Sequence, residues 1–329
     1  MNSAPFASGK VRECADVAHR AMSKTVSRDA RSRRYWLIDP MIVDPMETLP
    51  KPGDAEIVAV PIRHVDMAAR SRPYLLGARG EDSLAKLMPI YLERAASECL
   101  DAIDNGEPRA RSLCGCIDTA LPAEDLAEAL AAAAIVSDSA RRRRIFRFWD
   151  PRVLQHFALN GVRLEAWVAG FFGRWSFLDG FGRHRELRVE EAAAASAENR
   201  RLMAPADERW LDELSDLNAL FERNACFALE ALDGVWSGLR ESRSAAAGLR
   251  LDDRKSCLAF ASMRWQSKLP IEASSRLQEI LKAARESGAA IEAVLADVDE
   301  TDLSLIRAEA ASTNHRATSP AASLSGSNA

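Results

Sequence analysis

The spacing of apolar residues changes near residue 189, and this change limits the possible folds more than any other feature of the sequence. Up to residue 188, short apolar runs bounded by proline, glycine or aspartate are typical of buried strands, and they alternate with segments of helical spacing. After residue 189 the strand signals end, and apolar residues such as Trp210, Leu214 and Leu217 recur at helical spacing. The sequence therefore predicts an α+β protein, with an N-terminal mixed α/β lobe containing a small sheet and an all-helical C-terminal lobe.

The same patterns divide the 329 residues into four segments. We predict a helical extension at residues 1–32, a mixed α/β domain at residues 33–188 and a helical lobe at residues 189–311. Residues 312–329 are rich in serine, alanine, threonine and asparagine, without apolar periodicity. A segment of that composition buries too little apolar surface to fold, so we expect a disordered tail.

Within the mixed domain, the predicted strands are short and the predicted helices are amphipathic. We expect strands at 35–40, 56–62, 74–78, 111–118 and 143–149, and a β-hairpin over 166–188 whose tight turn contains Asp179-Gly180. We expect helices at 9–28, 82–103 and 122–134, and a further helix after Asp150-Pro151. Pro89 lies inside the second of these helices and is expected to kink or split it.

Charge and cysteine content exclude several classes of protein. The formal net charge is −4, which argues against nucleic acid as the main partner. The N-terminal residues contain no apolar segment of a signal peptide, and no apolar run is long enough to span a membrane, so we expect a cytoplasmic protein without a membrane partner. The six cysteines are scattered, and the close pair Cys114 and Cys116 has no second pair or histidine nearby. We interpret them as reduced thiols, and we expect neither a metal site nor a cofactor.

Positive charge is concentrated in one part of the chain, which begins with RRRRIFRFWDPRVLQHF at residues 141–157. From Arg141 to Arg188, eleven arginines stand against four acids, a local balance of +7. Such asymmetry indicates a surface that faces an acidic or anionic partner. The run Arg141–Arg144 fits two interpretations equally well, a solvated loop and a partner-binding site, and the sequence leaves both open.

Arg147 interrupts an apolar stripe. If residues 143–149 form a strand, Ile145, Arg147 and Trp149 share one of its faces. A buried or half-buried arginine needs a carboxylate partner, ideally one that binds it with two hydrogen bonds. The candidate partners are Asp39, Asp118 and Asp150.

The pair Asp150-Pro151 is typical of a helix start. Aspartate at the N-cap accepts a hydrogen bond from a backbone N–H of the first turn, and proline at the next position lacks an N–H that would otherwise have no partner. The predicted helix has Val153, Leu154 and Phe157 on its inner face and ends near Asn160-Gly161. Helix capping alone therefore accounts for Asp150 and Pro151.

Three segments together resemble a known family. The segment RIFRFWDPRVLQHF (144–157) contains an aromatic-Arg-aromatic-aromatic-Asp-Pro-Arg run, YWLIDP (35–40) resembles the family's first strand, and RPYLLGA (72–78) resembles its Pro-Tyr-Leu strand. In this order they resemble the type VI secretion effector adaptor/chaperone family, domain of unknown function 4123. The resemblance covers residues 33–180 well and the helical lobe only loosely. The run Arg141–Arg144 is heavier than the family pattern requires.

The resemblance implies a non-catalytic protein of the cytoplasm of Gram-negative bacteria. Members of the family bind a cognate toxic effector and help to load it onto the VgrG spike of the type VI secretion machine. We therefore expect an effector and a VgrG protein as partners, and no enzymatic activity. The residues agree with this expectation, because the sequence has no phosphate-binding loop, dinucleotide fingerprint, HExxH motif or GxSxG elbow.

The candidate site combines the motif with the arginine-rich hairpin that follows it. It comprises Arg147, Trp149, Asp150, Pro151, Arg152, Arg174 and Trp175. We expect either an internal polar network that holds the motif or a partner-binding surface formed by Arg147, Arg152, Arg174 and Trp175. Two other functions stay open: a nucleic-acid or anion-binding protein that uses residues 141–188, and a motifless enzyme that uses His64, Asp66 and His184.

Overall fold

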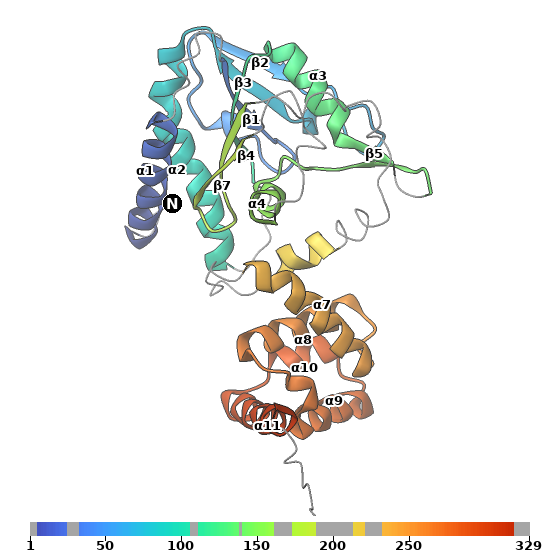
Figure 1. The fold of residues 1–329 in the computed structure, drawn as a ribbon. Helices are drawn as coiled ribbons and strands as arrows, with labels where there is room; N and C mark the ends of the chain where they lie inside the picture. The colour runs from blue at the N-terminus through green and yellow to red at the C-terminus, as the bar shows by residue number, and fades with distance from the viewer. Residues whose placement is uncertain are drawn as a thin grey trace, which may run out of the picture. The chain divides into compact units, whose positions relative to one another are not determined.

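The computed structural model describes residues 5–24, 33–105, 111–137, 140–160, 173–188, 213–220 and 232–318. The chain divides into two compact units, Met1–Ser215 and Asp216–Ala329. The described part of the first unit contains a sheet with helices, and that of the second unit contains helices (Figure 1). This confirms the α+β class. The predicted boundary at residue 189 falls in 189–212, outside the described residues.

The first unit is built around a six-stranded sheet in which neighbouring strands are antiparallel. In spatial order, the strands are β2 (Ala55–Ala59), β3 (Tyr74–Ala78), β1 (Arg33–Ile38), β4 (Leu113–Thr119), β7 (Arg174–Leu178) and β8 (His184–Arg188). β2 ends at Ala59 instead of the predicted Ile62, because Pro61 has no N–H to donate to a neighbouring strand.

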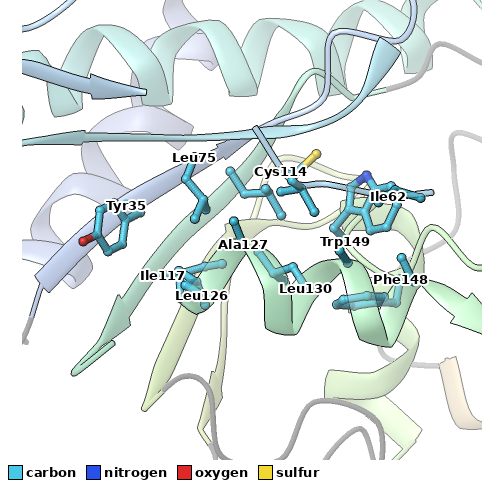
Figure 2. Packing of buried hydrophobic residues seen from close by; sticks show 14 of the residues in the cluster. Tyr35, Ile62, Leu75, Cys114, Ile117, Leu126, Ala127, Leu130, Phe148 and Trp149 are labelled. Carbon is cyan, nitrogen blue, oxygen red and sulfur yellow. The ribbon is translucent and has the colours of Figure 1, made fainter. Parts of the chain in front are cut away.

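Alternation along β1 divides the core into two layers, one on each face of the sheet. Tyr35 and Leu37 belong to a buried cluster that α3 (Ala123–Ala134) covers, and Figure 2 shows Tyr35 among its members. Trp36 and Ile38 belong to a second cluster with residues of α1 (Pro5–Lys24) and α2 (Glu81–Asn105), which lie side by side (Figure 1). Successive residues of a strand point to opposite faces, so a strand buried on both sides has a continuous apolar run.

The helices of the first unit begin close to the predicted positions. α1 covers most of the predicted helix at 9–28, and residues 25–28 lie outside the described residues. α2 continues through Pro89 as one helix, so the predicted split does not occur. One backbone hydrogen bond is lost at a proline, and the packing of the neighbouring Met88, Tyr91 and Leu92, which are buried, outweighs that loss.

The predicted strand at 143–149 is wrong in its second half. β6 (Arg143–Ile145) pairs with β5 (Ile135–Ser137) in a separate two-stranded sheet, and the chain turns after it, where Asp150 N–H donates to Arg147 O at 3.1 Å. A regular strand would send Phe148 and Trp149 to opposite faces. The turn instead brings both rings into the cluster under α3, and this burial outweighs the strand pattern (Figure 2).

The predicted hairpin at 166–188 is present in its described part, where β7 and β8 pair from Arg174↔Arg188 to Leu178↔His184. Asp179 organises the turn, because its Oδ1 accepts hydrogen bonds from the backbone N–H groups of Phe181 at 2.9 Å and Arg183 at 3.0 Å. Gly182 has a φ of 76°, a conformation that glycine adopts without strain. Residues 161–172 lie outside the described residues.

The second unit is helical in its described part. Its helices are α7 (Leu232–Gly248), α8 (Arg254–Ser267), α9 (Ser275–Ser287), α10 (Ile291–Ala296) and α11 (Glu300–Thr318). Side-chain caps mark their starts: Asp253 accepts from Ser256 N–H at α8, and Ser274 accepts from Leu277 N–H at α9. α11 extends seven residues into the segment for which we predicted a tail. Among the described residues, no helix combines the length and the hydropathy that a membrane crossing needs.

Candidate functional site

Asp39 is the centre of the motif's hydrogen-bond network. Its carboxylate is almost wholly buried, and its Oδ2 accepts hydrogen bonds from Arg147 Nη2 at 2.7 Å and from Trp149 Nε1 at 2.6 Å. Its Oδ1 accepts a third from Met41 N–H at 3.1 Å. Of the three predicted carboxylate partners of Arg147, Asp39, the residue that follows β1, is the one that binds it. Charge-assisted bonds of this kind are stronger than neutral ones.

Asp150 and Arg152 form a second pair at the start of the helix that follows. Asp150 Oδ1 accepts from Arg152 Nε at 3.0 Å, and Oδ2 accepts from Arg152 Nη2 at 2.7 Å. The same Oδ1 accepts from the backbone N–H of Arg152 at 2.9 Å, so Asp150 caps α4 (Pro151–Asn160) as the sequence predicts. Burial raises the pKa of Asp150, but the charge and hydrogen bonds of Arg152 outweigh burial and hold the pKa below its usual value.

The two pairs lie around the buried thiol of Cys114. Burial raises the pKa of Cys114 well above its usual value, and the negative charges of Asp39 and Asp150 raise it further, whereas Arg147 acts in the opposite direction. Cys116, the other member of the close cysteine pair, belongs to the cluster on the opposite face of the sheet. The two thiols therefore cannot bind one metal ion together.

The segment after Asp39 is held at both ends and exposes apolar side chains between them. Met41, Ile42 and Val43 have 51%, 63% and 51% of their surface exposed. Asp39 holds the first end through Met41 N–H, and Asp44 holds the second, accepting from Met46 N–H at 2.9 Å and from Tyr74 Oη at 2.6 Å. We call Met41–Val43 the apolar loop. Three consecutive exposed apolar residues on a fixed backbone are typical of a protein-binding surface.

A third ionic group crosses the sheet on the face of α1 and α2. Asp118 on β4 lies between Arg34 on β1 and Arg174 on β7, which are its neighbours in register. Arg34 Nε lies 2.7 Å from Asp118 Oδ1, and Arg174 Nε lies 2.7 Å from Asp118 Oδ2. Arg174 is only 8% exposed. The charge of Arg174 is therefore used in an ionic group that joins β1, β4 and β7.

The structure buries most of the predicted contact region. Trp175 is fully buried, with Nε1 donating to Cys114 O at 3.1 Å, and Trp149, Asp150 and Pro151 are also buried. Arg147 and Arg152 keep 24% and 18% of their side chains exposed. Alternation on β7 turns Trp175 into the cluster under α3 and Arg174 towards Asp118, so these two residues offer little surface to a partner. Arg147, Trp149, Asp150 and Arg152 all take part in the hydrogen bonds described above.

The residues of the predicted enzyme site separate into two places. His64 Nδ1 accepts from Asp66 N–H at 3.2 Å, and His64 Nε2 lies 3.0 Å from Arg143 O, so backbone groups occupy both ring nitrogens. His184 pairs with Leu178 at the start of β8, and burial lowers its pKa. Among the described residues, no hydrogen bond joins His184 to the other two. The geometry brings together His64 and Asp66 alone.

The apolar loop is not among the site residues predicted from the sequence. Its signal is present in DPMIVDP (39–45), where an apolar triplet stands between two Asp-Pro pairs. Each aspartate can accept a hydrogen bond from a backbone N–H two residues later, and each proline restricts the backbone beside it. The pattern therefore indicates a rigid turn, but it does not show that the triplet faces solvent.

Residues 59–161 match the family model described as Domain of unknown function (DUF4123). The matched segment includes β3, α2, β4, α3 and the motif with Arg147 and Asp150. Asp39, which binds Arg147 and Trp149, lies before this segment, and β7 and β8 lie after it. No curated protein and no solved structure matches the chain.

Proposed function

We propose that this protein is a non-catalytic adaptor or chaperone of the cytoplasm that binds a cognate type VI secretion effector and loads it onto the VgrG spike. The observation that carries the proposal is the apolar loop Met41–Val43, exposed and fixed at both ends by Asp39 and Asp44. The match of residues 59–161 to the family that the sequence resembles supports it.

The network explains how a buried motif can serve binding. Arg147 and Trp149 are too deeply placed to contribute much contact area themselves. Their hydrogen bonds to Asp39 hold the first end of the apolar loop, and the loop presents its side chains without first becoming ordered. Less ordering on association means a smaller entropy cost, so a short apolar segment can bind a partner more tightly.

Binding would bury the apolar loop against an apolar segment of the effector. Ile42, the most exposed of the three residues, is the central anchor of the proposed contact. Arg147 lies beside the fixed end of the loop and keeps part of its side chain exposed, so it can contribute charge at the rim. Neither the apolar contact of the loop nor the charge of Arg147 requires a chemically reacting group.

Isolation of the tagged protein from its native cytoplasm, with mass spectrometry of the bound proteins, tests the proposal. We expect an effector and a VgrG protein to be recovered with the wild type. Ile42→Asp should reduce effector recovery about tenfold or more, because it places a charge at the centre of an apolar contact. Ile90→Asp, at an isoleucine of α2 that is 40% exposed, is the matched control and should leave recovery unchanged.

Three results would contradict the proposal. The wild type could recover neither partner, the two aspartate variants could bind the effector equally well, or nucleic acid alone could be recovered and released by salt. Thermal unfolding of each variant shows whether a loss of binding comes from a loss of folding. A variant that unfolds at the wild-type temperature and no longer binds would support the apolar loop as the contact.

A further inference from the structure

The four consecutive arginines lie on a hairpin that extends from the body of the first unit. β5 and β6 pair from Ile135↔Ile145 to Ser137↔Arg143, and Figure 1 shows this hairpin extending away from the six-stranded sheet. Arg141, Arg142, Arg143 and Arg144 are all exposed. From Ile135 to Ile145 the chain has four arginines and one acid, Asp138. The hairpin therefore carries a dense positive charge whose electrostatic role the motif network does not explain.

An exposed apolar residue lies beside the hairpin. His64 Nε2 and Arg143 O are 3.0 Å apart, which joins the loop after β2 to β6. The next residue, Val65, is 95% exposed, the most exposed of the large apolar residues in the described part of the chain. The same loop contains the exposed Arg63 and Asp66, one charge of each sign, so it leaves the positive balance unchanged. We call Val65 with Arg141–Arg144 the arginine-hairpin surface.

The composition of this surface favours a protein over a nucleic acid as partner. Proteins that bind single-stranded nucleic acid place aromatic rings where bases can stack on them. Here the neighbouring rings are buried: Phe146 is 6% exposed, Phe148 0% and Trp149 1%. What the surface offers is a run of exposed arginines beside an exposed aliphatic side chain. Guanidinium groups bind carboxylates with two parallel hydrogen bonds, and an exposed aliphatic residue beside them suits an apolar side chain of a protein.

We propose that the arginine-hairpin surface is a docking site for an acidic segment of a partner protein, in which carboxylates pair with Arg141–Arg144 and an apolar side chain covers Val65. This proposal rests on the proposed function, because it takes this chain to be an adaptor whose partner is a protein. It adds a second contact, distinct from the apolar loop, and it states the chemistry of what binds there. Such charge pairing increases the rate of association and selects among partners.

A photo-crosslinking amino acid in place of Val65, introduced in the native host, tests the proposal and captures the partner in the same step. The same amino acid in place of Val17 is the matched control, since Val17 is an exposed valine on α1. We expect position 65 to form a crosslink to a protein, and the crosslinked peptide to be acidic. Position 17 should not form that crosslink.

Charge dependence is measured with a second pair of variants. Arg143→Gln with Arg144→Gln should reduce the crosslink yield from position 65 about fivefold or more, because it removes half of the charge of the run. Arg12→Gln with Arg20→Gln removes two exposed arginines from α1 and should leave the yield unchanged. Equal unfolding temperatures would show that both double variants fold.

Each other outcome overturns the proposal. These outcomes are no protein crosslink at position 65, a crosslinked segment without acidic residues, equal yields with Arg143 and Arg144 neutralised, a crosslink to nucleic acid, and a crosslink to a second copy of this chain. The result also separates the two proposals. An acidic partner that is neither effector nor spike would overturn the proposed function alone, whereas recovery of effector and spike with a charge-independent crosslink would overturn the docking site alone.

Discussion

At the scale of single residues, the motif owes its geometry to one carboxylate. Asp39 accepts hydrogen bonds from Arg147, Trp149 and Met41 N–H, although only 3% of its surface is exposed. A buried carboxylate is stable only where charge and hydrogen bonds replace water. Loss of any one donor should therefore affect the folded state and the adjoining apolar loop together.

We expect Arg147→Met to decrease the free energy of unfolding by about 3 kcal/mol, because it leaves the charge of Asp39 buried without its cation. Trp149→Phe removes one neutral donor, and its loss of hydrogen bonding should cost about 1–2 kcal/mol. Urea unfolding measures both. In the double variant Asp39→Asn with Arg147→Met, the loss should be smaller than the sum of the single losses, and additive values would contradict a direct pair.

The Asp150–Arg152 pair makes a prediction about pH. The pKa of Asp150 in the folded protein is below its unfolded value of about 3.9, so the pair stabilises the fold above about pH 4, and this contribution is lost as the pH falls through the folded pKa. Asp150→Asn keeps a capping side chain but not the charge. We expect its free energy of unfolding to decrease less between about pH 5 and pH 2 than that of the wild type.

The matched control for this pH series is Asp16→Asn, which changes an exposed aspartate of α1. Its pH profile should follow that of the wild type. If Asp150→Asn instead shows the full wild-type dependence on acid, the ionic pair with Arg152 does not contribute to stability. Chemical unfolding at each pH provides the measurement.

At the scale of elements, β4 depends on Gly115. Gly115 has a φ of 115°, and the strand pairing with β1 shifts its register beside it, between Trp36 and Ile38. A Cβ at this position would lie 2.6 Å from Ser176 O on β7 and 2.8 Å from Trp175 Nε1. The glycine thus permits a bend that brings β7 and its buried tryptophan close to β4.

We expect Gly115→Ala to decrease the free energy of unfolding by more than about 2 kcal/mol, since it combines backbone strain at a positive φ with a close contact to the main-chain oxygen of Ser176. Gly53→Ala is the matched control, because a Cβ there has no neighbour within 4 Å. Urea midpoints of the two variants test the difference. Similar midpoints would mean that β4 and β7 can separate without cost.

At the scale of the whole molecule, the two compact units have separate apolar cores. The first unit has clusters on both faces of its sheet, and the second has one that includes Phe260, Leu277 and Leu281. Units with separate cores often unfold in separate steps. We expect calorimetry of the full chain to resolve two transitions.

Leu277→Ala tests this division, because Leu277 is fully buried in the second unit. The variant should lower the midpoint of one transition, with a loss of about 2–5 kcal/mol in the free energy of unfolding of that unit, and leave the other unchanged. Ile117→Val, at a fully buried residue of the first unit, should affect the other transition. A single transition that both variants move equally would contradict independent units.

Much of the fold follows from the sequence by itself, because local rules decide it. The continuous apolar run Tyr35–Ile38 predicts a strand buried on both faces, and Asp150-Pro151 predicts the start of α4, since capping involves only neighbouring residues. The change of pattern near residue 189 likewise predicts sheet and helices before it and helices after it. These signals repeat within a few residues, so they do not depend on distant contacts.

The tertiary structure decided what depends on residues far apart in the chain. Arg147 has three plausible carboxylates in the sequence, and strand order brings Asp39 to it from 108 residues away, while Asp118 pairs with Arg34 and Arg174. The same packing ends β6 at Ile145, buries Trp175 and leaves Met41–Val43 exposed. Apolar periodicity predicts which residues are buried, but only the register of the sheet determines which residues they contact.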